Sequence, residues 1–117
     1  MSESSPAWVK EFPGSITVCD RAGVIVEMND GAVKAFAKQG GIALLGTNVL
    51  DCHPEPSRTK LRELLATGKV NVYTVESRGV RRLICQAPWH EDGQLRGLVE
   101  ISLVLPDDVP HFVRDGL

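Results

Sequence analysis

The clearest fold signal lies in residues 80–105, VRRLICQAPWHEDGQLRGLVEISLVL. Two strand-like runs flank a tight turn in this segment. The Asp92-Gly93 step is the strongest turn signal in the sequence, because a two-residue type I′ turn needs positive φ at both central positions. The runs 80–89 and 95–105 are therefore predicted to pair as an antiparallel hairpin.

A third strand and a covered sheet face are predicted around this hairpin. Residues 70–77 are also strand-like, so the simplest arrangement is an antiparallel meander of three strands. The run 98–105 is apolar on both faces, as expected for a central strand that is covered on each side. A short helix predicted over 6–12, or another subunit, would supply one of the two covers. The apolar side chains expected to share one face of that helix are Trp8, Val9 and Phe12.

A second hairpin is predicted near the N-terminus. The runs 16–19 and 24–28 are rich in β-branched residues, and the glycine-containing turn between them favours antiparallel pairing. Asn29 follows and is predicted to cap a helix that ends at Gly40-Gly41. An irregular connector is expected over 42–50.

The segment 48–57, NVLDCHPEPS, places a thiol and an imidazole where a second helix is predicted to begin. Pro54 and Pro56 suit the first turn of a helix, where a missing N–H costs nothing, and Thr67-Gly68 is expected to end it. Cys52 and His53 would then lie at the helix N-terminus. The positive end of the helix dipole favours an anion or a neutral imidazole there.

Composition excludes several classes of function. A chain of 117 residues with 43% hydrophobic content is predicted to form one domain around one core. A net charge of -2 gives no electrostatic basis for binding nucleic acid. No apolar run approaches about 18 residues and no signal peptide is evident, so a cytoplasmic protein without membrane contact is expected. The three cysteines are an odd number without metal-ligand spacing, which favours a reducing compartment and no zinc site.

The order of predicted elements is two strands, two helices and three strands. This order gives an α+β fold, with a five-stranded antiparallel sheet and helices packed on one face. The chain resembles the PAS domain in this order and in four motifs: DRAGVI at 20–25, Asn29 after the second strand, LLG at 44–46 and EDG at 91–93. We expect an N-terminal extension or short helix over 1–14, a PAS-like domain over 15–105 and a C-terminal tail over 106–117.

A narrower resemblance is to the PAS variety often found beside hemerythrin-like domains, which carries a Cys-His-Pro segment at the head of its long helix. Residues 52–54 match that segment, and residues 88–100 resemble its last hairpin, which ends in a glutamate. That family usually continues with a Gln-Asp pair and a signalling helix, whereas this chain continues Leu103-Val104-Leu105-Pro106. The tail is therefore predicted to lack a regular element.

The resemblance implies a sensory module and not an enzyme. A small ligand held between sheet and helices would change packing and so change contacts with a protein partner or within a homodimer. The fold alone names no ligand or cofactor. The alternatives are a ligand-free PAS dimerisation domain, a heme-based sensor, and a small α+β isomerase-like enzyme whose general base would be an inward, unpaired Glu100.

Five residues are candidates for ligand contact: His53, Cys52, Tyr73, Trp89 and Asn29. The His53 ring would bond the backbone and hold the connector, contact a ligand or anion, or serve as an axial heme ligand. Cys52 would be a reactive thiol at a helix start or a buried small residue. Tyr73 and Trp89 lie on predicted strands and would line the cavity or pack in the core or an interface. Asn29 is expected to cap a helix rather than meet a ligand.

Two adjacent arginines, Arg81 and Arg82, complete the candidates. Their opposite strand parity allows only one to face inward, where it would form a carboxylate-binding pocket. Otherwise both belong to a solvated strand edge.

Overall fold

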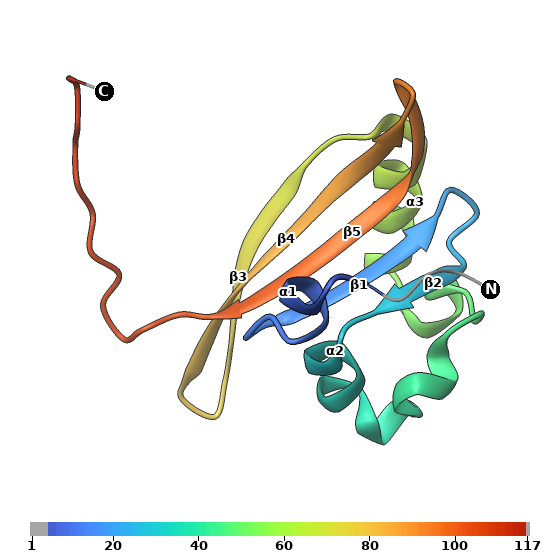
Figure 1. Cartoon of the computed structure of the whole chain (residues 1–117), viewed down its shortest axis with the longest axis horizontal. Coiled ribbons are helices and arrows are strands. Elements are labelled where there is room, and N and C mark those ends of the chain that lie inside the picture. Colours follow the sequence, from blue (N-terminus) through green and yellow to red (C-terminus); the bar gives the residue numbers. More distant parts are fainter. Residues whose placement is uncertain (1–4, 117) are drawn as a thin grey trace.

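The computed structural model describes residues 5–116 and shows a five-stranded antiparallel sheet in the order β2-β1-β5-β4-β3 (Figure 1). The strands are β1 (Ser15–Asp20), β2 (Ile25–Met28), β3 (Asn71–Ser77), β4 (Val80–Glu91) and β5 (Gln94–Val104). The helices are α1 (Ala7–Lys10), α2 (Asp30–Ala35) and α3 (Ser57–Thr67), with 3-10 turns η1 (Ala37–Gln39), η2 (Gly41–Leu44) and η3 (Val49–Cys52). The predicted α+β fold class is confirmed.

The Asp92-Gly93 turn has the predicted geometry, and the other turn of the meander has the same sign of φ. Asp92 and Gly93 have φ of 52° and 78°, as a type I′ turn requires, and Arg78 and Gly79 have φ of 54° and 78°. β5 consequently pairs with β4 along its length and with β1 on its other side. The last strand in the sequence is therefore the central strand of the sheet.

The start of the long helix differs from the prediction. η3 ends at Cys52, His53 is extended with φ of -114° and ψ of 121°, and α3 begins only at Ser57. The helical region is disfavoured for the residue before a proline, so His53 is extended before Pro54 and the helix does not begin at Pro54. Cys52 and His53 therefore do not lie at a helix N-terminus, and the dipole argument does not apply to them.

The helix that follows Asn29 also ends earlier than predicted. α2 stops at Ala35, and the chain continues through η1 and η2, which occupy part of the predicted connector. Asn29 caps α2 as predicted, because its side chain accepts a hydrogen bond from the Ala32 N–H. In residues 37–44, which include several alanines and glycines, short 3-10 turns therefore replace a regular helix.

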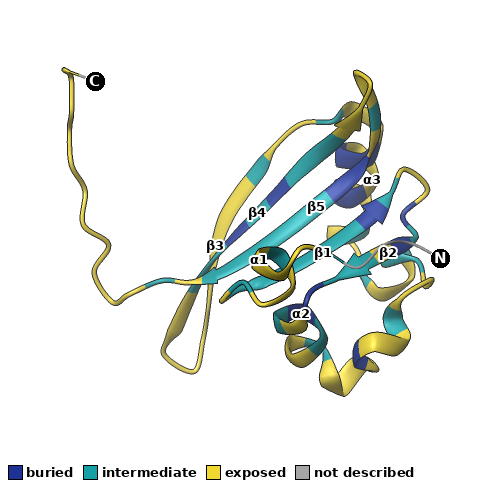
Figure 2. Cartoon of the chain, viewed as in Figure 1, coloured by how far each residue is buried: buried dark blue, intermediate teal, exposed yellow. Residues whose placement is uncertain are grey.

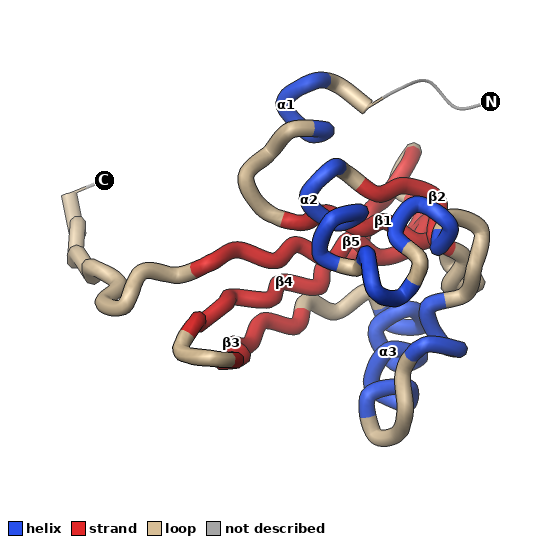
Figure 3. The backbone as a smooth tube through the Cα atoms, turned by 90° about the horizontal axis from the view of Figure 1, so that it is seen from below, coloured by secondary structure: helices blue, strands red, loops and turns tan. Residues whose placement is uncertain are grey.

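The hydrophobic core lies between α3 and one face of the sheet, which we call the inner face. Leu61, Leu64 and Leu65 of α3 pack against Cys19 of β1 and Leu98 of β5. Figure 2 shows the buried positions concentrated where α3 meets these strands. α1 lies on the opposite, outer side of the sheet from α3 (Figures 1 and 3). The N-terminal helix thus lies on the side of the sheet where a second cover was predicted for the central strand.

The cover provided by α1 is only partial. Trp8 is 74% exposed, whereas Val9 and Phe12 are half-buried, so the three residues do not share one buried face as predicted. After Leu105 the described tail holds no helix or strand, as predicted. It runs away from the body of the protein (Figure 1). Within residues 5–116, no helix combines the length and the apolar character needed to cross a bilayer.

Candidate functional site

A cavity of about 270 Å³ lies between the inner face and the helical segments, and we call it the inner cavity. The sheet contributes Thr17, Cys19, Ile25, Met28, Tyr73, Leu98 and Glu100 to its lining, and the helical side contributes Phe36, Gln39, Leu44, Val49, Cys52, His53 and Leu61. Apolar walls with a few convergent polar groups are typical of sites that bind small molecules. Three of the five candidate residues line this cavity: Cys52, His53 and Tyr73.

The His53 side chain is held by its own backbone turn. Its Nδ1 lies 2.6 Å from the Val49 carbonyl oxygen, and a carbonyl only accepts, so Nδ1 carries the proton and donates. When the ring is neutral, the Nε2 atom keeps its lone pair. The His53 carbonyl accepts a hydrogen bond from Arg58 Nε at 3.0 Å, which ties this residue to α3. The geometry agrees with the backbone-bonding interpretation and leaves one ring nitrogen unused.

Cys52 is exposed at the end of η3 and also lines the cavity. Its Sγ lies 3.8 Å from the Asn48 carbonyl oxygen. Asn48 in turn shapes the turn, because its side chain accepts a hydrogen bond from the Leu50 N–H. The interpretation of Cys52 as a buried core residue is wrong, and no helix start is present to activate its thiol.

A ladder of polar side chains crosses the inner face of the sheet. Asn71 of β3 donates from Nδ2 to Gln86 Oε1 at 2.8 Å, and Gln86 of β4 donates from Nε2 to Glu100 Oε2 at 2.8 Å. The register places Asn71 opposite Gln86 and Gln86 opposite Glu100, so each contact joins direct cross-strand neighbours. Only Glu100 of these three lines the cavity.

Tyr73 and Glu100 share the electrostatic environment of this cavity. Burial raises the pKa of the Tyr73 hydroxyl above its usual value, and the negative charge of Glu100 raises that pKa further. Both effects disfavour a phenolate, so Tyr73 presents a neutral hydroxyl. Tyr73 lines the cavity, which is one of the two locations that its position on a strand left open.

Trp89 does not line the inner cavity. It lies opposite Gly97 in the β4–β5 register, on the outer face, and its indole Nε1 donates to the Cys19 carbonyl oxygen at 2.9 Å. A β-bulge interrupts the register between Trp89 and His90, so the side of the sheet on which Trp89 lies could not be obtained by counting from the turn. The prediction of Trp89 as a cavity residue is wrong, and its polar group serves the backbone.

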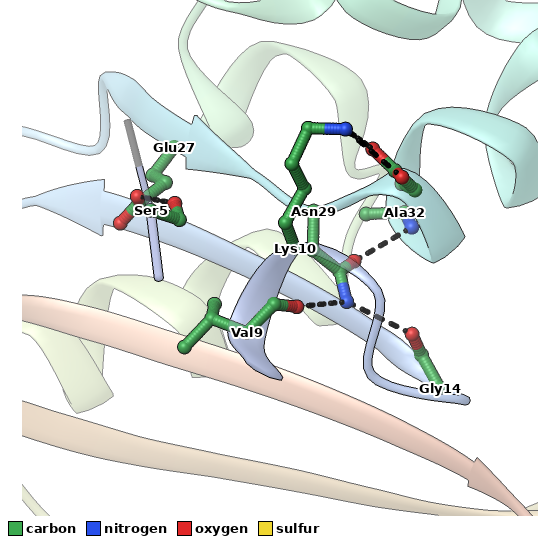
Figure 4. Close-up of polar contacts among 8 residues, drawn as sticks. Ser5, Val9, Lys10, Gly14, Glu27, Asn29 and Ala32 are labelled. Carbon is green, nitrogen blue, oxygen red and sulfur yellow. Dashed lines mark hydrogen bonds and ion pairs between the residues drawn. The ribbon is translucent and has the colours of Figure 1, made fainter. Parts of the chain in front are cut away.

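Asn29 is also absent from the lining, because its side chain is fully used elsewhere. The residue is 2% exposed. Its Oδ1 accepts from the Ile16 and Ala32 N–H groups, and its Nδ2 donates to the Val9 and Gly14 carbonyls (Figure 4). A side-chain amide has no further capacity after two donated and two accepted hydrogen bonds. Asn29 therefore joins α1, β1 and α2 and has nothing left to offer a ligand.

Neither of the two candidate arginines lines the cavity. Arg82 pairs in register with Val75 and Val104, toward the far end of the strands, and Arg81 lies near Glu76, with 3.8 Å between Nε and Oε1. No lysine or arginine lines the inner cavity in the described part of the chain. The carboxylate-binding pocket expected from Arg81 or Arg82 is therefore not formed.

Sequence reasoning missed Asn71 and Gln86 altogether, and it considered Glu100 only as an unpaired base. The available signal was the presence of polar residues inside otherwise apolar strands. Their alignment across three strands depends on registers that the turns alone do not fix. Because Glu100 accepts a hydrogen bond from Gln86, it does not match the unpaired acid required for the isomerase-like alternative.

No protein-family model matches this chain, and no curated protein is detectably similar to it. Solved structures do share its architecture. A C-terminal domain from Streptococcus mutans is 21% identical, with a TM-score of 0.67 over 82% of this chain and 78% of that one. The PAS domain of BvgS from Bordetella pertussis is 18% identical, with a TM-score of 0.62 over 85% and 82%.

A third similar structure is the Aer2 receptor from Vibrio cholerae, described as a dual PAS-heme oxygen sensor. It is 11% identical, with a TM-score of 0.60 over 80% of this chain and 95% of that chain. These similarities show that the chain has a PAS fold.

Proposed function

We propose that this chain is a PAS-type sensory module, which binds a small ligand in the inner cavity and signals through protein–protein contacts. The observation that carries the proposal is the composition of the cavity wall. Sheet residues such as Tyr73 and Glu100 face the same space as Cys52 at the end of η3 and His53 just after it. A ligand there would contact the sheet and its helical cover at once. Sensor proteins among the similar structures support this function.

A route from the cavity to the rest of the domain is present in the packing. Val49 lines the cavity, its carbonyl holds the His53 ring, and its side chain packs with Leu50 against the core cluster. A ligand that binds one arrangement of η3 more tightly than another shifts the population toward that arrangement. The packing of α3 against the sheet would change with it.

Heme does not fit the inner cavity. Pockets for drug-sized ligands measure roughly 300–1,000 Å³, and a porphyrin is larger than most such ligands, whereas this cavity measures about 270 Å³. The free Nε2 of His53 is thus better suited to a contact with a small organic molecule. We propose no catalytic reaction for the site.

The proposal is tested by native mass spectrometry and a visible absorption spectrum of freshly purified protein. A retained small molecule should add mass to the wild-type chain. That mass should disappear in His53→Ala and persist in His90→Ala, which changes an exposed histidine outside the cavity. Equal retention in both variants would remove His53 from the site, and absence of any added mass would favour the alternative below.

The alternative function is a ligand-free dimerisation module. Exposed apolar side chains in α1 and on one region of the outer face favour this alternative. Their exposure to water does not stabilise a monomer, whereas a dimer interface would bury them. Trp8 is 74% exposed and Val72 of β3 is 54% exposed. A dimeric mass in solution that Trp8→Ser converts to a monomer would support pairing through α1. A monomer at high micromolar concentration would contradict it.

A further inference from the structure

The inner cavity holds one unbalanced negative charge. Glu100 is the only carboxylate among its lining residues, and no lysine or arginine lies beside it in the described part of the chain. Arg58 is linked to a lining residue, because its Nε donates to the His53 carbonyl, but the Arg58 side chain is not part of the lining. A carboxylate on the ligand would meet repulsion in this cavity and no countercharge.

The polar ladder fixes which oxygen of Glu100 is available. An ionised carboxylate only accepts, so Gln86 must present its NH₂ group to Glu100 and its carbonyl to Asn71, as the structure shows. Glu100 Oε2 is occupied by Gln86. Its Oε1 has no hydrogen-bond partner among the described residues, and the residue lines the cavity. The ladder thus holds an acceptor in place at the wall.

Among the remaining polar groups of the wall, His53 favours a ligand that donates hydrogen bonds, whereas Thr17, Gln39 and Tyr73 can each donate as well as accept. His53 offers the lone pair of Nε2, since Nδ1 donates to Val49. Burial raises the pKa of Tyr73, and the Glu100 charge raises that pKa further, so the negative potential of Glu100 reaches this part of the wall. The Glu100 carboxylate both disfavours an anion and favours a donor.

The rest of the wall is apolar and sets the size and character of the ligand. Met28, Phe36, Leu44 and Leu61 surround the space, and the volume of about 270 Å³ limits the ligand to a compact molecule. Apolar lining of this kind favours a hydrocarbon or single-ring body by removing it from water. A ligand that suits both parts has an apolar body and one cationic donor.

On the basis of the function proposed above, we propose that the inner cavity recognises a small, mainly apolar amine, whose protonated nitrogen donates to Glu100. The charge-assisted hydrogen bond replaces part of the hydration that the ammonium group loses. The Asn71–Gln86 pair acts as a positioning element, because it holds Glu100 against the sheet.

A matched set of three compounds tests this proposal: benzylamine, benzyl alcohol and benzoate, which share a ring and differ in the charge of the polar group. Binding is measured by isothermal titration calorimetry near pH 7. Benzylamine should bind at least tenfold more tightly than benzyl alcohol, a difference of about 1.4 kcal/mol. Benzoate should bind most weakly. The comparison uses the unchanged protein and does not depend on a variant that folds.

The variant Glu100→Gln keeps the shape of the side chain and removes its charge. It should weaken benzylamine binding about tenfold and leave benzyl alcohol unchanged. The matched control is Glu76→Gln, which removes an exposed carboxylate from β3 and should change neither affinity. Circular dichroism confirms that each variant is folded.

The outcomes separate this proposal from the function on which it rests. If benzyl alcohol or benzoate binds as tightly as benzylamine, the amine class is wrong and the sensory function stands. If no compound binds and native mass spectrometry shows no retained molecule, both proposals fail. If a molecule is retained but its accurate mass corresponds to a formula without nitrogen, the amine proposal is overturned alone.

Discussion

Trp89 donates its indole N–H to the backbone carbonyl of Cys19, and this contact joins β4 to β1 across the strand between them. The intervening residue is Gly97 of β5. It lies opposite Trp89 of β4 on one side and opposite Asp20 of β1 on the other. A side chain at that position would occupy the space that the indole uses. The central strand therefore depends on a glycine at the one place where its neighbours meet.

Replacement of Gly97 by alanine should destabilise the fold. A Cβ there would lie 2.0 Å from the Cys19 carbonyl oxygen and 2.8 Å from Trp89 Nε1, so the strands must separate. We expect a loss of about 2–3 kcal/mol in the free energy of unfolding, measured with urea. Gly116→Ala is the control, because nothing lies within 4 Å of its added Cβ. Equal stability of the two variants would contradict the close approach.

Replacement of Asn29 by alanine should be at least as costly. Four backbone groups, from Val9, Gly14, Ile16 and Ala32, lose their partner in a buried position. Each buried group left without a hydrogen bond costs about 1–3 kcal/mol, although water can satisfy some of them. We expect a total loss of about 3 kcal/mol and faster amide hydrogen exchange at Ile16 and Ala32. Asn71→Ala, which removes one hydrogen bond, should cost clearly less.

Acid should weaken the start of α3 through Glu55. The carboxylate accepts hydrogen bonds from the Thr59 hydroxyl and the Thr59 N–H, and these lower the pKa of Glu55 below its usual value of 4.5. A lowered pKa stabilises the folded state above about pH 4.5, and that contribution disappears as the pH falls through the folded value. Glu55→Gln should therefore reduce the loss of stability between pH 6 and pH 3, as measured by urea unfolding. Glu11→Gln, at an exposed carboxylate in another segment, should leave that loss unchanged.

The cysteines should differ sharply in their reaction with a thiol reagent. Cys19 is buried, and burial raises the pKa of its thiol, so the reactive thiolate is rare in the folded protein. Cys52 is exposed. With iodoacetamide at pH 8, Cys52 should be alkylated first, and Cys19 should react only after addition of denaturant. Peptide mass spectrometry identifies the modified residue, and early labelling of Cys19 would show that the core opens.

The fold could be predicted from local signals that act over a few residues. The Asp92-Gly93 step determines a turn by its backbone requirements, and Asn29 determines a cap by its side-chain chemistry. These signals were sufficient for the order of elements and the sheet. They failed at Pro54, where the sequence offered a helix start. His53 is extended before this proline, and the helix begins only at Ser57.

The site was only partly predictable, because it depends on strand register. Tyr73 could be placed at the cavity wall by its position on a strand, but Trp89 lies beyond a bulge that no residue pattern announced. The hydrogen bond from Gln86 to Glu100 requires the register of β4 and β5 to be known to within one residue. A shift of one residue would have moved every one of these side chains to the other face.

The central position of β5 also has a mechanical consequence. Glu100 lies four residues before Val104, where the strand ends and the tail leaves the sheet. At about 3.4 Å per residue in an antiparallel strand, the carboxylate at the cavity wall and the exit of the chain are separated by only about 14 Å of continuous backbone. A displacement of Glu100 would be transmitted directly to the tail. The same strand can therefore both contact a ligand and transmit its effect.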